Sequence, residues 1–186
     1  MRMFVGIGLP EECRTSIVRA LSPVAETGLP VSWTRAENLH ITLKFLGEVP
    51  DARVEELGGL LAESARGTGP FRFLVEGAGG FPTLSSPRIL WAGVREPLDP
   101  VRKLHQNMEK ILAGAGFPRE GRLFHPHVTV GRVRRRLPAG WTERFGGALS
   151  GKRFGEVPAR SYQLYESRLS PSGSTYTVLV DVPFGG

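Results

Sequence analysis

The sequence holds a single cysteine and no long hydrophobic run. Cys13 alone cannot form an internal disulfide, and this low cysteine content fits a reducing compartment. No stretch approaches the roughly 18 apolar residues of a membrane span. The apolar start of the chain is interrupted at Pro10 and carries no cleavage site typical of a signal peptide. We therefore expect a cytoplasmic protein without membrane association.

Metal ligands and phosphate-binding loops are also scarce. The chain has four histidines, and although His125 and His127 are close in sequence, no cysteine or further histidine completes a metal site. No glycine-rich phosphate loop precedes a suitable helix. The sequence therefore predicts neither a resident metal ion nor a nucleotide cofactor.

What the chain does have is apolar content and positive charge. Its 186 residues are 40% hydrophobic, enough for one compact domain with a substantial core. The 24 Lys and Arg residues exceed the 18 acidic residues, which favours a polyanionic partner. The densest basic stretch is Arg132 with residues 134–136, and it is either a solvated loop or part of such a binding surface.

A short pattern occurs twice in the chain. The pattern His-apolar-Thr-apolar covers residues 40–43 and 127–130, so the copies are 87 residues apart. The same offset places Gly6 on Gly93 and Ile17 on Leu104. A repeat this long indicates a duplicated lobe with a pseudo-two-fold axis. We expect pseudo-repeats of about 1–87 and 88–186 within one domain that spans 1–186.

Apolar spacing predicts an α+β fold with mainly antiparallel sheets. Asp51 is expected to cap the second helix, and Pro23 to kink or end the first. Val18 is expected on the buried face of the first helix. The turn at residues 170–174 should join a terminal hairpin. The expected strands are 3–9, 31–35, 39–46, 71–75, 88–94, 126–132, 162–169 and 175–182, and the expected helices begin near 11, 51 and 98.

The repeated pattern suits acid and base catalysis. Residues i and i+2 of a strand share a face, so His40 and Thr42 point one way, and His127 and Thr129 do the same in the second copy. Two imidazoles can serve as general base and general acid in one turnover. Two hydroxyls can bind phosphoryl oxygens. The pattern predicts a phosphodiester held between the histidines, in an arrangement that needs no metal.

The other two histidines have weaker claims on function. His105 lies on the apolar side of a predicted helix, which indicates a structural role. His125 shares a strand face with His127, so we expect it to support that residue or to contact the substrate.

The two longer signatures, residues 39–49 and 124–132, resemble those of the two-histidine phosphoesterases. Within that superfamily the chain is similar, from end to end, to the bacterial and archaeal RNA 2',3'-cyclic phosphodiesterases, historically called 2'-5' RNA ligases. The resemblance implies a bilobal duplicated fold with two mainly antiparallel sheets around a central cleft and helices packed outside. It also implies hydrolysis of RNA 2',3'-cyclic phosphate ends to 2'-phosphates, with reversible 2'-5' ligation as the same chemistry run backward.

The resemblance also assigns roles. His40 would be the proton donor and His127 the proton acceptor, although the pseudosymmetry of the halves allows the opposite polarity. Thr42 and Thr129 would hold phosphoryl oxygens, and Arg132 would neutralise the phosphate. On a regular strand Arg132 points away from His127, so its participation needs a bulge or twist near Gly131.

Three further residues are candidate substrate contacts. Lys44 has the strand parity of His40 but could equally be a solvated edge charge. Arg35 could contact the substrate, and Phe124 could stack on a base or pack in the core.

Two other functions stay open. One is a phosphodiesterase for small cyclic nucleotides or 2'-5'-linked oligonucleotides. The other is a non-catalytic module that binds RNA ends, for which a pair of catalytic histidines would be unnecessary. In each case we expect a monomer with an RNA or nucleotide partner.

Overall fold

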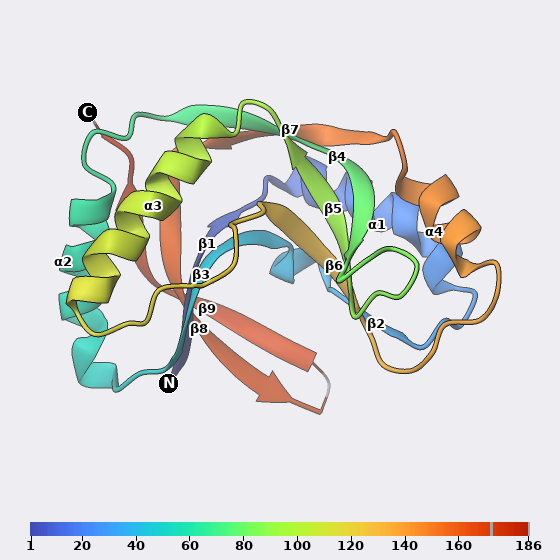
Figure 1. The fold of residues 1–186 in the computed structure, drawn as a ribbon, viewed down its shortest axis with the longest axis horizontal. Helices are drawn as coiled ribbons and strands as arrows, with labels where there is room; N and C mark the ends of the chain where they lie inside the picture. The colour runs from blue at the N-terminus through green and yellow to red at the C-terminus, as the bar shows by residue number, and fades with distance from the viewer. Residues whose placement is uncertain (172, 186) are drawn as a thin grey trace.

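The computed structural model describes residues 1–171 and 173–185, which form an α+β fold of antiparallel strands with helices outside (Figure 1). The order of elements follows the sequence prediction, with additions in the second half. The strands are β1 Arg2–Gly8, β2 Val31–Trp33, β3 His40–Glu48, β4 Phe71–Phe81, β5 Ile89–Arg95, β6 His127–Val133, β7 Arg153–Ala159, β8 Ser161–Ser170 and β9 Gly173–Pro183. The α-helices are α1 Glu11–Ala25, α2 Val54–Ser64, α3 Asp99–Gly114 and α4 Trp141–Leu149, with short 3-10 helices at Ala36–Asn38 (η1) and Asp51–Arg53 (η2).

The strands form one curled sheet rather than the two sheets that we expected. Their order is β7-β4-β5-β6-β3-β1-β8-β9, and β2 adds to β6. The junction between β3 and β6 is a single residue pair, Ile41 with Val128. The expectation of two separate sheets is therefore wrong at this one pair, which joins them into a continuous sheet.

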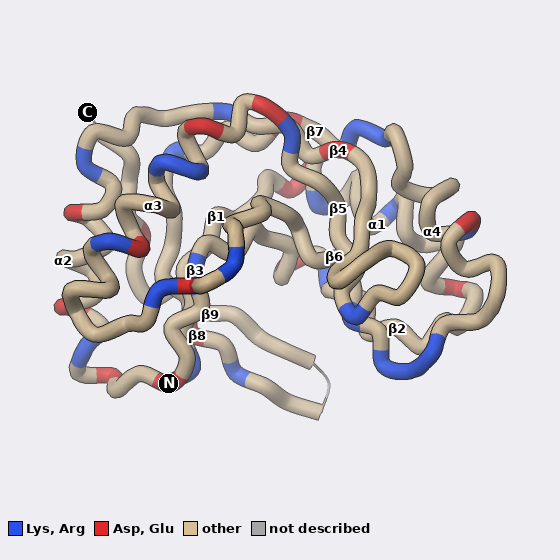
Figure 2. The backbone as a smooth tube through the Cα atoms, in the orientation of Figure 1, with Lys and Arg blue, Asp and Glu red and all other residues tan. Residues whose placement is uncertain are grey.

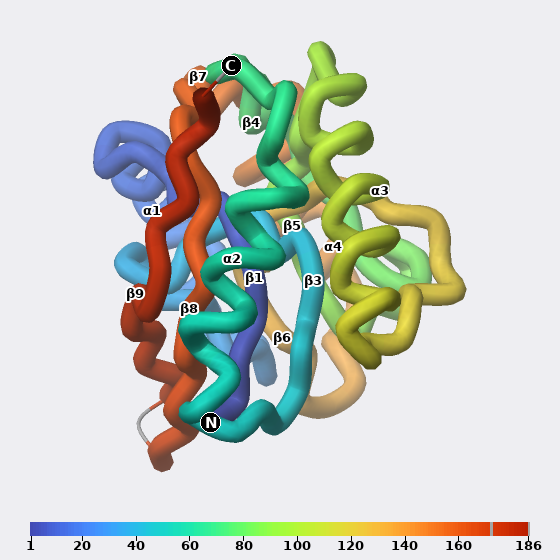
Figure 3. The backbone as a smooth tube through the Cα atoms, turned by 90° about the vertical axis from the view of Figure 1, so that its left-hand side faces the viewer, coloured from blue at the N-terminus to red at the C-terminus, as the bar shows by residue number. Residues whose placement is uncertain are grey.

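The sheet and its helices divide into two lobes. The first lobe holds β1, β3, β8 and β9 under α2 and α3, and the second holds β2, β4, β5, β6 and β7 with α1 and α4 (Figure 1). Figure 3 shows α2 and α3 side by side in front of the first lobe's strands. In the second lobe, α1 from the first half of the sequence packs on β7 and α4 from the second half. In the first lobe, α2 from the first half packs on α3 and β9 from the second half. Each lobe therefore takes strands and helices from both halves.

The repeat is less regular in its strands than in its motifs. Gly93 of β5 pairs with His127, but the residue of β1 that pairs with His40 is Gly8 rather than Gly6. The offset of 87 relates Gly93 to Gly6, so the pairing of β5 with β6 differs by two residues from the pairing of β1 with β3. A shift of two preserves the side-chain face, so the buried positions still agree.

The helices bury most of the predicted faces, with an exception inside α1 and differences at the helix ends. Val18 is 37% exposed and does not join the core. Pro23 lies inside α1, which continues to Ala25. Asp51 begins η2 and makes no capping hydrogen bond, so α2 starts at Val54. Helix α4 and strand β7 were not predicted, because three glycines obscure the helical pattern of residues 140–149 and β7 contains Gly155 and a proline.

The terminal hairpin is confirmed. Ser170 pairs with Gly173 at its end, and Ser172 of the predicted turn lies outside the described residues. The amide of Asn38 donates a hydrogen bond to the Ser174 carbonyl at 2.7 Å, so η1 is tied to the hairpin directly before the first motif. None of the helices in the described ranges is long and apolar enough to cross a membrane.

Candidate active site

The two motifs meet where β3 crosses β6. Ile41 and Val128 pair directly and are fully buried. Since paired residues of antiparallel strands share a face, the neighbours of both lie on the opposite face. Those neighbours are half-buried: His40, Thr42, His127 and Thr129. The histidines are diagonal across the junction, a relation that separates residues by roughly 7–8 Å in regular sheets and their Cβ atoms by somewhat less.

Both imidazoles are fixed by the same kind of hydrogen bond. Nδ1 of His40 donates to the carbonyl of Asn38 at 2.6 Å, and Nδ1 of His127 donates to the carbonyl of His125 at 2.7 Å. In the neutral rings this leaves a lone pair on each Nε2. Nε2 of His40 lies 2.9 Å from the hydroxyl of Thr42. Each motif therefore presents an Nε2 that can take up or deliver a proton.

The surroundings favour the neutral imidazoles. Burial lowers the pKa of His40 to about 4, and the charges of His127 and Arg132 add to this effect, against the hydrogen bond to Asn38. Burial also lowers the pKa of His127, with added effects from the charges of His125 and Arg132 and opposition from its backbone hydrogen bond. In the free protein at neutral pH, the imidazole of His40 is therefore uncharged.

Aromatic rings surround both histidines, and the sequence did not indicate them. His40 lies 4.8 Å from the ring of Phe4 and 5.3 Å, edge-on, from Tyr176. His127 lies 4.9 Å, edge-on, from Phe81 and 6.3 Å from Trp91. These rings come from β1, β9, β4 and β5. The alternation of side chains along each strand shows which rings share a face of that strand. Only the pairing of the strands shows that this face is the one that carries the histidines.

Two glycines make room for these rings. A Cβ on Gly6 would lie 2.7 Å from the Ile41 carbonyl and 3.2 Å from Cδ2 of His40. A Cβ on Gly79 would lie 2.1 Å from the indole of Trp91. All three separations are closer than ordinary van der Waals contact, so the absence of a side chain at each glycine leaves room for the neighbouring strand and ring.

Both motif strands carry a bulge at the last residue of the motif. On β3, Thr42 pairs with Gly6 and Lys44 with Val5, so Leu43 is the extra residue. On β6, Thr129 pairs with Trp91 and Gly131 with Leu90, so Val130 is the extra residue. Leu43 and Val130 are themselves related by the offset of 87. From this point each strand reverses its side-chain parity.

The bulge moves Lys44 to the core side. Lys44 is 1% exposed, and its Nζ donates to Oε1 of Glu109 at 2.5 Å and to the Pro118 carbonyl at 2.9 Å. The parity that placed Lys44 beside His40 is therefore wrong, and so is the alternative of a solvated edge charge. Lys44 instead ties β3 to α3 and the loop that follows it.

The same reversal brings Arg132 to the histidine face. Arg132 pairs with Ile89 beyond the bulge and is exposed. Its charge lowers the pKa of both His40 and His127. The bulge that we required near Gly131 is therefore confirmed. Residues 134–136 continue into the loop between β6 and α4, where Figure 2 shows a run of basic positions beside β2.

The remaining candidates lie outside the histidine pair. Phe124 stacks on His105 with centroids 4.0 Å apart and an angle of 6°, so one face of its ring is covered. His105 is buried, as expected for a structural residue. Arg35 lies near the β8–β9 hairpin, with its guanidinium carbon 3.9 Å from a Cβ built on Gly173. His125 is exposed and 6.3 Å from His127 between ring centroids.

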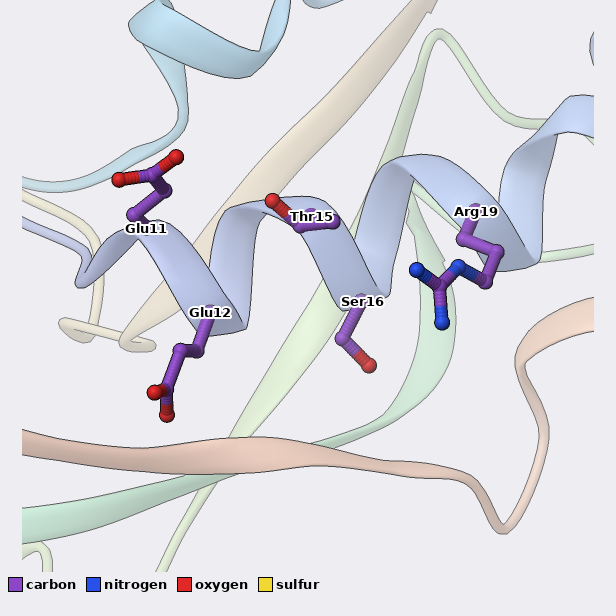
Figure 4. Close-up of a pocket in the computed structure, with 5 residues that line it drawn as sticks. All are labelled: Glu11, Glu12, Thr15, Ser16 and Arg19. Carbon is purple, nitrogen blue, oxygen red and sulfur yellow. The ribbon is translucent and has the colours of Figure 1, made fainter.

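Two hollows on the surface are lined by residues other than His40 and His127. One of about 400 Å³ lies along α1 (Figure 4), and another of about 350 Å³ lies beside α3. The first is lined by Glu11, Glu12, Thr15, Ser16 and Arg19, and the second by His105, Gln106, Glu109, Lys110, Arg119 and Glu120. Across residues 1–171 and 173–185, no group of three or more His, Cys, Asp or Glu side chains could hold a metal ion.

Comparison with known proteins gives one consistent family. The model of the LigT-like phosphoesterases matches the chain twice, over residues 7–91 and 93–176. An RNA 2',3'-cyclic phosphodiesterase from Thermotoga maritima is 34% identical over 186 residues, covering 100% of this chain and 97% of that protein. One from Archaeoglobus fulgidus is 36% identical over 179 residues, covering 95% of this chain and 96% of that protein.

Solved structures give the same result. TT0787 of Thermus thermophilus matches with a TM-score of 0.82 and 28% identity, over 99% of this chain and 98% of that one. E. coli LigT complexed with 3'-AMP matches with a TM-score of 0.78 and 28% identity, over 100% of this chain and 98% of that one. The double match of the family model agrees with the duplication read from the sequence.

Proposed function

The chain belongs to the LigT-like phosphoesterase family, and from that premise we propose that it hydrolyses RNA 2',3'-cyclic phosphate ends to 2'-phosphomonoesters, with His40 and His127 as acid and base. The observation that carries this proposal is the crossing at Ile41 and Val128, with two His-Thr pairs on one face. In this proposal the substrate lies over this pair, on the face that carries both histidines and both threonines.

The reaction moves two protons. The Nε2 lone pair of His127 takes a proton from water as the water oxygen attacks phosphorus. The bond from phosphorus to the 3' oxygen breaks, and Nε2 of His40 delivers a proton to that oxygen. The products are a 2'-phosphate and a 3'-hydroxyl. General acid and general base catalysis each contribute roughly 10²–10⁴-fold.

The threonines and Arg132 bind the phosphoryl oxygens. The Thr42 hydroxyl, which lies 2.9 Å from Nε2 of His40, turns to an oxygen of the substrate. Thr129 does the same on the other side. The guanidinium of Arg132 offsets the negative charge by hydrogen bonds to charged oxygens, which are about twice as strong as neutral ones.

The low pKa of His40 has a consequence for its role as acid. With a pKa of about 4, His40 is neutral in the free protein at pH 7. A phosphodiester anion beside the ring favours the protonated form and raises that pKa. His40 therefore acquires its proton together with the substrate.

The direct test is turnover of an RNA oligomer that ends in a 2',3'-cyclic phosphate, with EDTA present and the product isomer identified. We expect a 2'-phosphate from the wild type and at least about a 100-fold loss of kcat in His40→Ala and His127→Ala. Retention of the RNA without turnover would instead favour the non-catalytic binding module. Normal rates in either variant would remove the mechanism.

A second substrate tests which histidine is the acid and which is the base. A 4-nitrophenolate leaves without protonation, so an aryl phosphodiester does not require the acid. If His40 is the acid, His40→Ala retains a larger fraction of wild-type activity on bis(4-nitrophenyl) phosphate than on RNA, whereas His127→Ala loses both. The reverse pattern would exchange the two roles.

Related substrates use the same groups. E. coli LigT has been crystallised with 3'-AMP, NADP+ and ATP, so small cyclic nucleotides belong in the same assay. Reversible 2'-5' ligation needs only a 5'-hydroxyl in place of water. Since one chain supplies both histidines, we expect the monomer to be active.

A further inference from the structure

We propose that Arg134, held by Ser32, binds the phosphodiester one nucleotide upstream of the cyclic phosphate, an inference that rests on the proposed function and extends it along the RNA strand. Arg134 lies two residues beyond Arg132, directly after the end of β6. The enzyme would then prefer the end of an RNA strand to a single cyclic nucleotide.

The pairing of β2 with β6 brings Ser32 to the face that carries the histidines. Ser32 pairs with Arg132, and paired residues of antiparallel strands share a face. Arg132 is on the histidine face because of the bulge at Val130. Nε of Arg134 donates a hydrogen bond to the Ser32 hydroxyl at 2.6 Å. Because the Cβ atoms of a directly opposed pair are about 5 Å apart, Nε of Arg134 lies within roughly 10 Å of the Cβ of Arg132.

Two contacts hold Arg134 in this position. Its amide donates to the carbonyl of Pro30 at 2.8 Å, which fixes the backbone beyond β6. The hydrogen bond to Ser32 fixes the side chain through Nε, which carries one of the five N–H groups of the guanidinium. The N–H groups on the two terminal nitrogens form the planar fork that matches a phosphate. A long side chain that is already held loses less rotamer freedom when it binds an anion.

The charges of Arg132 and Arg134 are not offset by carboxylates of the protein. Four other arginines form ion pairs with glutamates: Arg53, Arg72, Arg153 and Arg168. Among the residues that the structure describes, neither Arg132 nor Arg134 forms such a pair. Both are exposed. Two adjacent guanidiniums without an acidic partner, on the histidine face, favour a ligand with two successive negative charges.

An RNA strand that ends in a cyclic phosphate supplies these two charges. Arg132 would bind the cyclic phosphate, and the phosphodiester on the 5' side of the same nucleoside is the next anion along the strand. Proteins that bind single strands follow the backbone with basic groups, and such contacts do not depend on the base. Figure 2 shows basic positions continuing into the loop beside β2, so we expect the strand to leave the site in that direction.

The test uses two dinucleotides that end in a 2',3'-cyclic phosphate and differ only in the linkage between the nucleosides. One has a phosphodiester, and the other has an uncharged methylphosphonate; both have a 2'-deoxynucleoside upstream, which keeps the linkage stable. In the wild type, kcat/KM should be roughly 3- to 30-fold higher for the phosphodiester, mainly through KM. In Arg134→Gln this ratio should fall to within about twofold of unity, because the upstream charge has lost its partner.

Two further variants test the position of the charge. Arg136→Gln removes the same charge two residues further along the loop and should retain the wild-type ratio. Ser32→Ala removes the acceptor that holds Nε and should lower the ratio by a smaller factor than Arg134→Gln. An unchanged ratio in Ser32→Ala would contradict the role of Ser32.

The remaining outcomes separate this site from the proposed function. A wild-type ratio near unity would overturn the upstream phosphate site, and so would equal losses in Arg134→Gln and Arg136→Gln, since only the net charge of the surface would then matter. In both cases hydrolysis of the dinucleotides would still support the proposed function. If the wild type hydrolyses neither dinucleotide, the proposed function fails and the site at Arg134 fails with it.

Discussion

At the residue scale, the same local hydrogen bond orients both histidines. In each motif the imidazole donates from Nδ1 to a carbonyl two residues earlier in the chain. This bond selects the tautomer and orients the ring, so that in the neutral imidazole the lone pair is on Nε2. The carbonyl that accepts this bond belongs to the same segment of chain, so a short local pattern is enough to orient each ring.

The low pKa of His40 should appear in the pH dependence of stability. Below pH 6.5 the unfolded chain protonates this histidine, while the folded protein keeps it neutral down to about pH 4. The unfolded state then binds more protons, so the free energy of unfolding falls as pH is lowered through this window. At about 1.4 kcal/mol per pKa unit, His40 contributes a loss of about 3 kcal/mol.

Urea denaturation between pH 7.5 and 4 measures this effect. His40→Asn should flatten the decline relative to wild type, whereas a surface change such as Val18→Ala should leave the slope unchanged. An equally steep decline in His40→Asn would show that other groups, including His127, account for the acid sensitivity.

At the element scale, the bulges decide which side chains reach the site. Periodicity predicted strands near residues 39–46 and 126–132, but a regular strand assigns Lys44 to the histidine face and Arg132 to the opposite one. One extra residue, at Leu43 and at Val130, reverses both assignments. A bulge depends on the neighbouring strand, so the sequence of one strand could not locate it, although the parity conflict of Arg132 indicated that one was needed.

The ion pair created by the bulge should be important for stability. Burial alone would raise the pKa of Glu109, but hydrogen bonds from Lys44 and the Glu120 amide lower it. Lys44→Met leaves that carboxylate buried without its cation, so the free energy of unfolding at pH 7 should fall by about 3–5 kcal/mol. Urea denaturation of the variant measures this loss.

A second substitution separates the charge from the packing. Lys44→Met combined with Glu109→Leu removes both charges and should recover much of the loss, because an apolar pair can replace a buried ion pair. A loss below about 1 kcal/mol in the single variant would contradict a buried, unpaired carboxylate.

At the scale of the whole molecule, the duplication and the lobes do not coincide. The motif offset predicted two similar halves, and the family model matches each of them. The sequence could not show that the halves exchange elements, since packing between distant segments leaves no periodic signal. In the structure β1 pairs with β8, β4 pairs with β7, and α1 packs on β7.

The exchange predicts that neither half folds alone. A fragment of residues 1–87 lacks β8, which pairs with β1, and lacks β5 and β7, which pair with β4 on either side. A fragment of residues 88–186 lacks β1 and β3 between β6 and β8. Each should show no cooperative thermal transition by circular dichroism, because each lobe needs strands from both halves to bury its core.

Coexpression of the two fragments completes the test. Together they contain every strand pair and both histidines, so they should associate and recover hydrolysis of the RNA cyclic phosphate. Pairing His40→Ala in the first fragment with a wild-type second fragment should give an associated but inactive complex, which separates assembly from chemistry. A cooperative transition in either isolated fragment would show that a sequence half is an independent folding unit, despite the strands that cross between the halves.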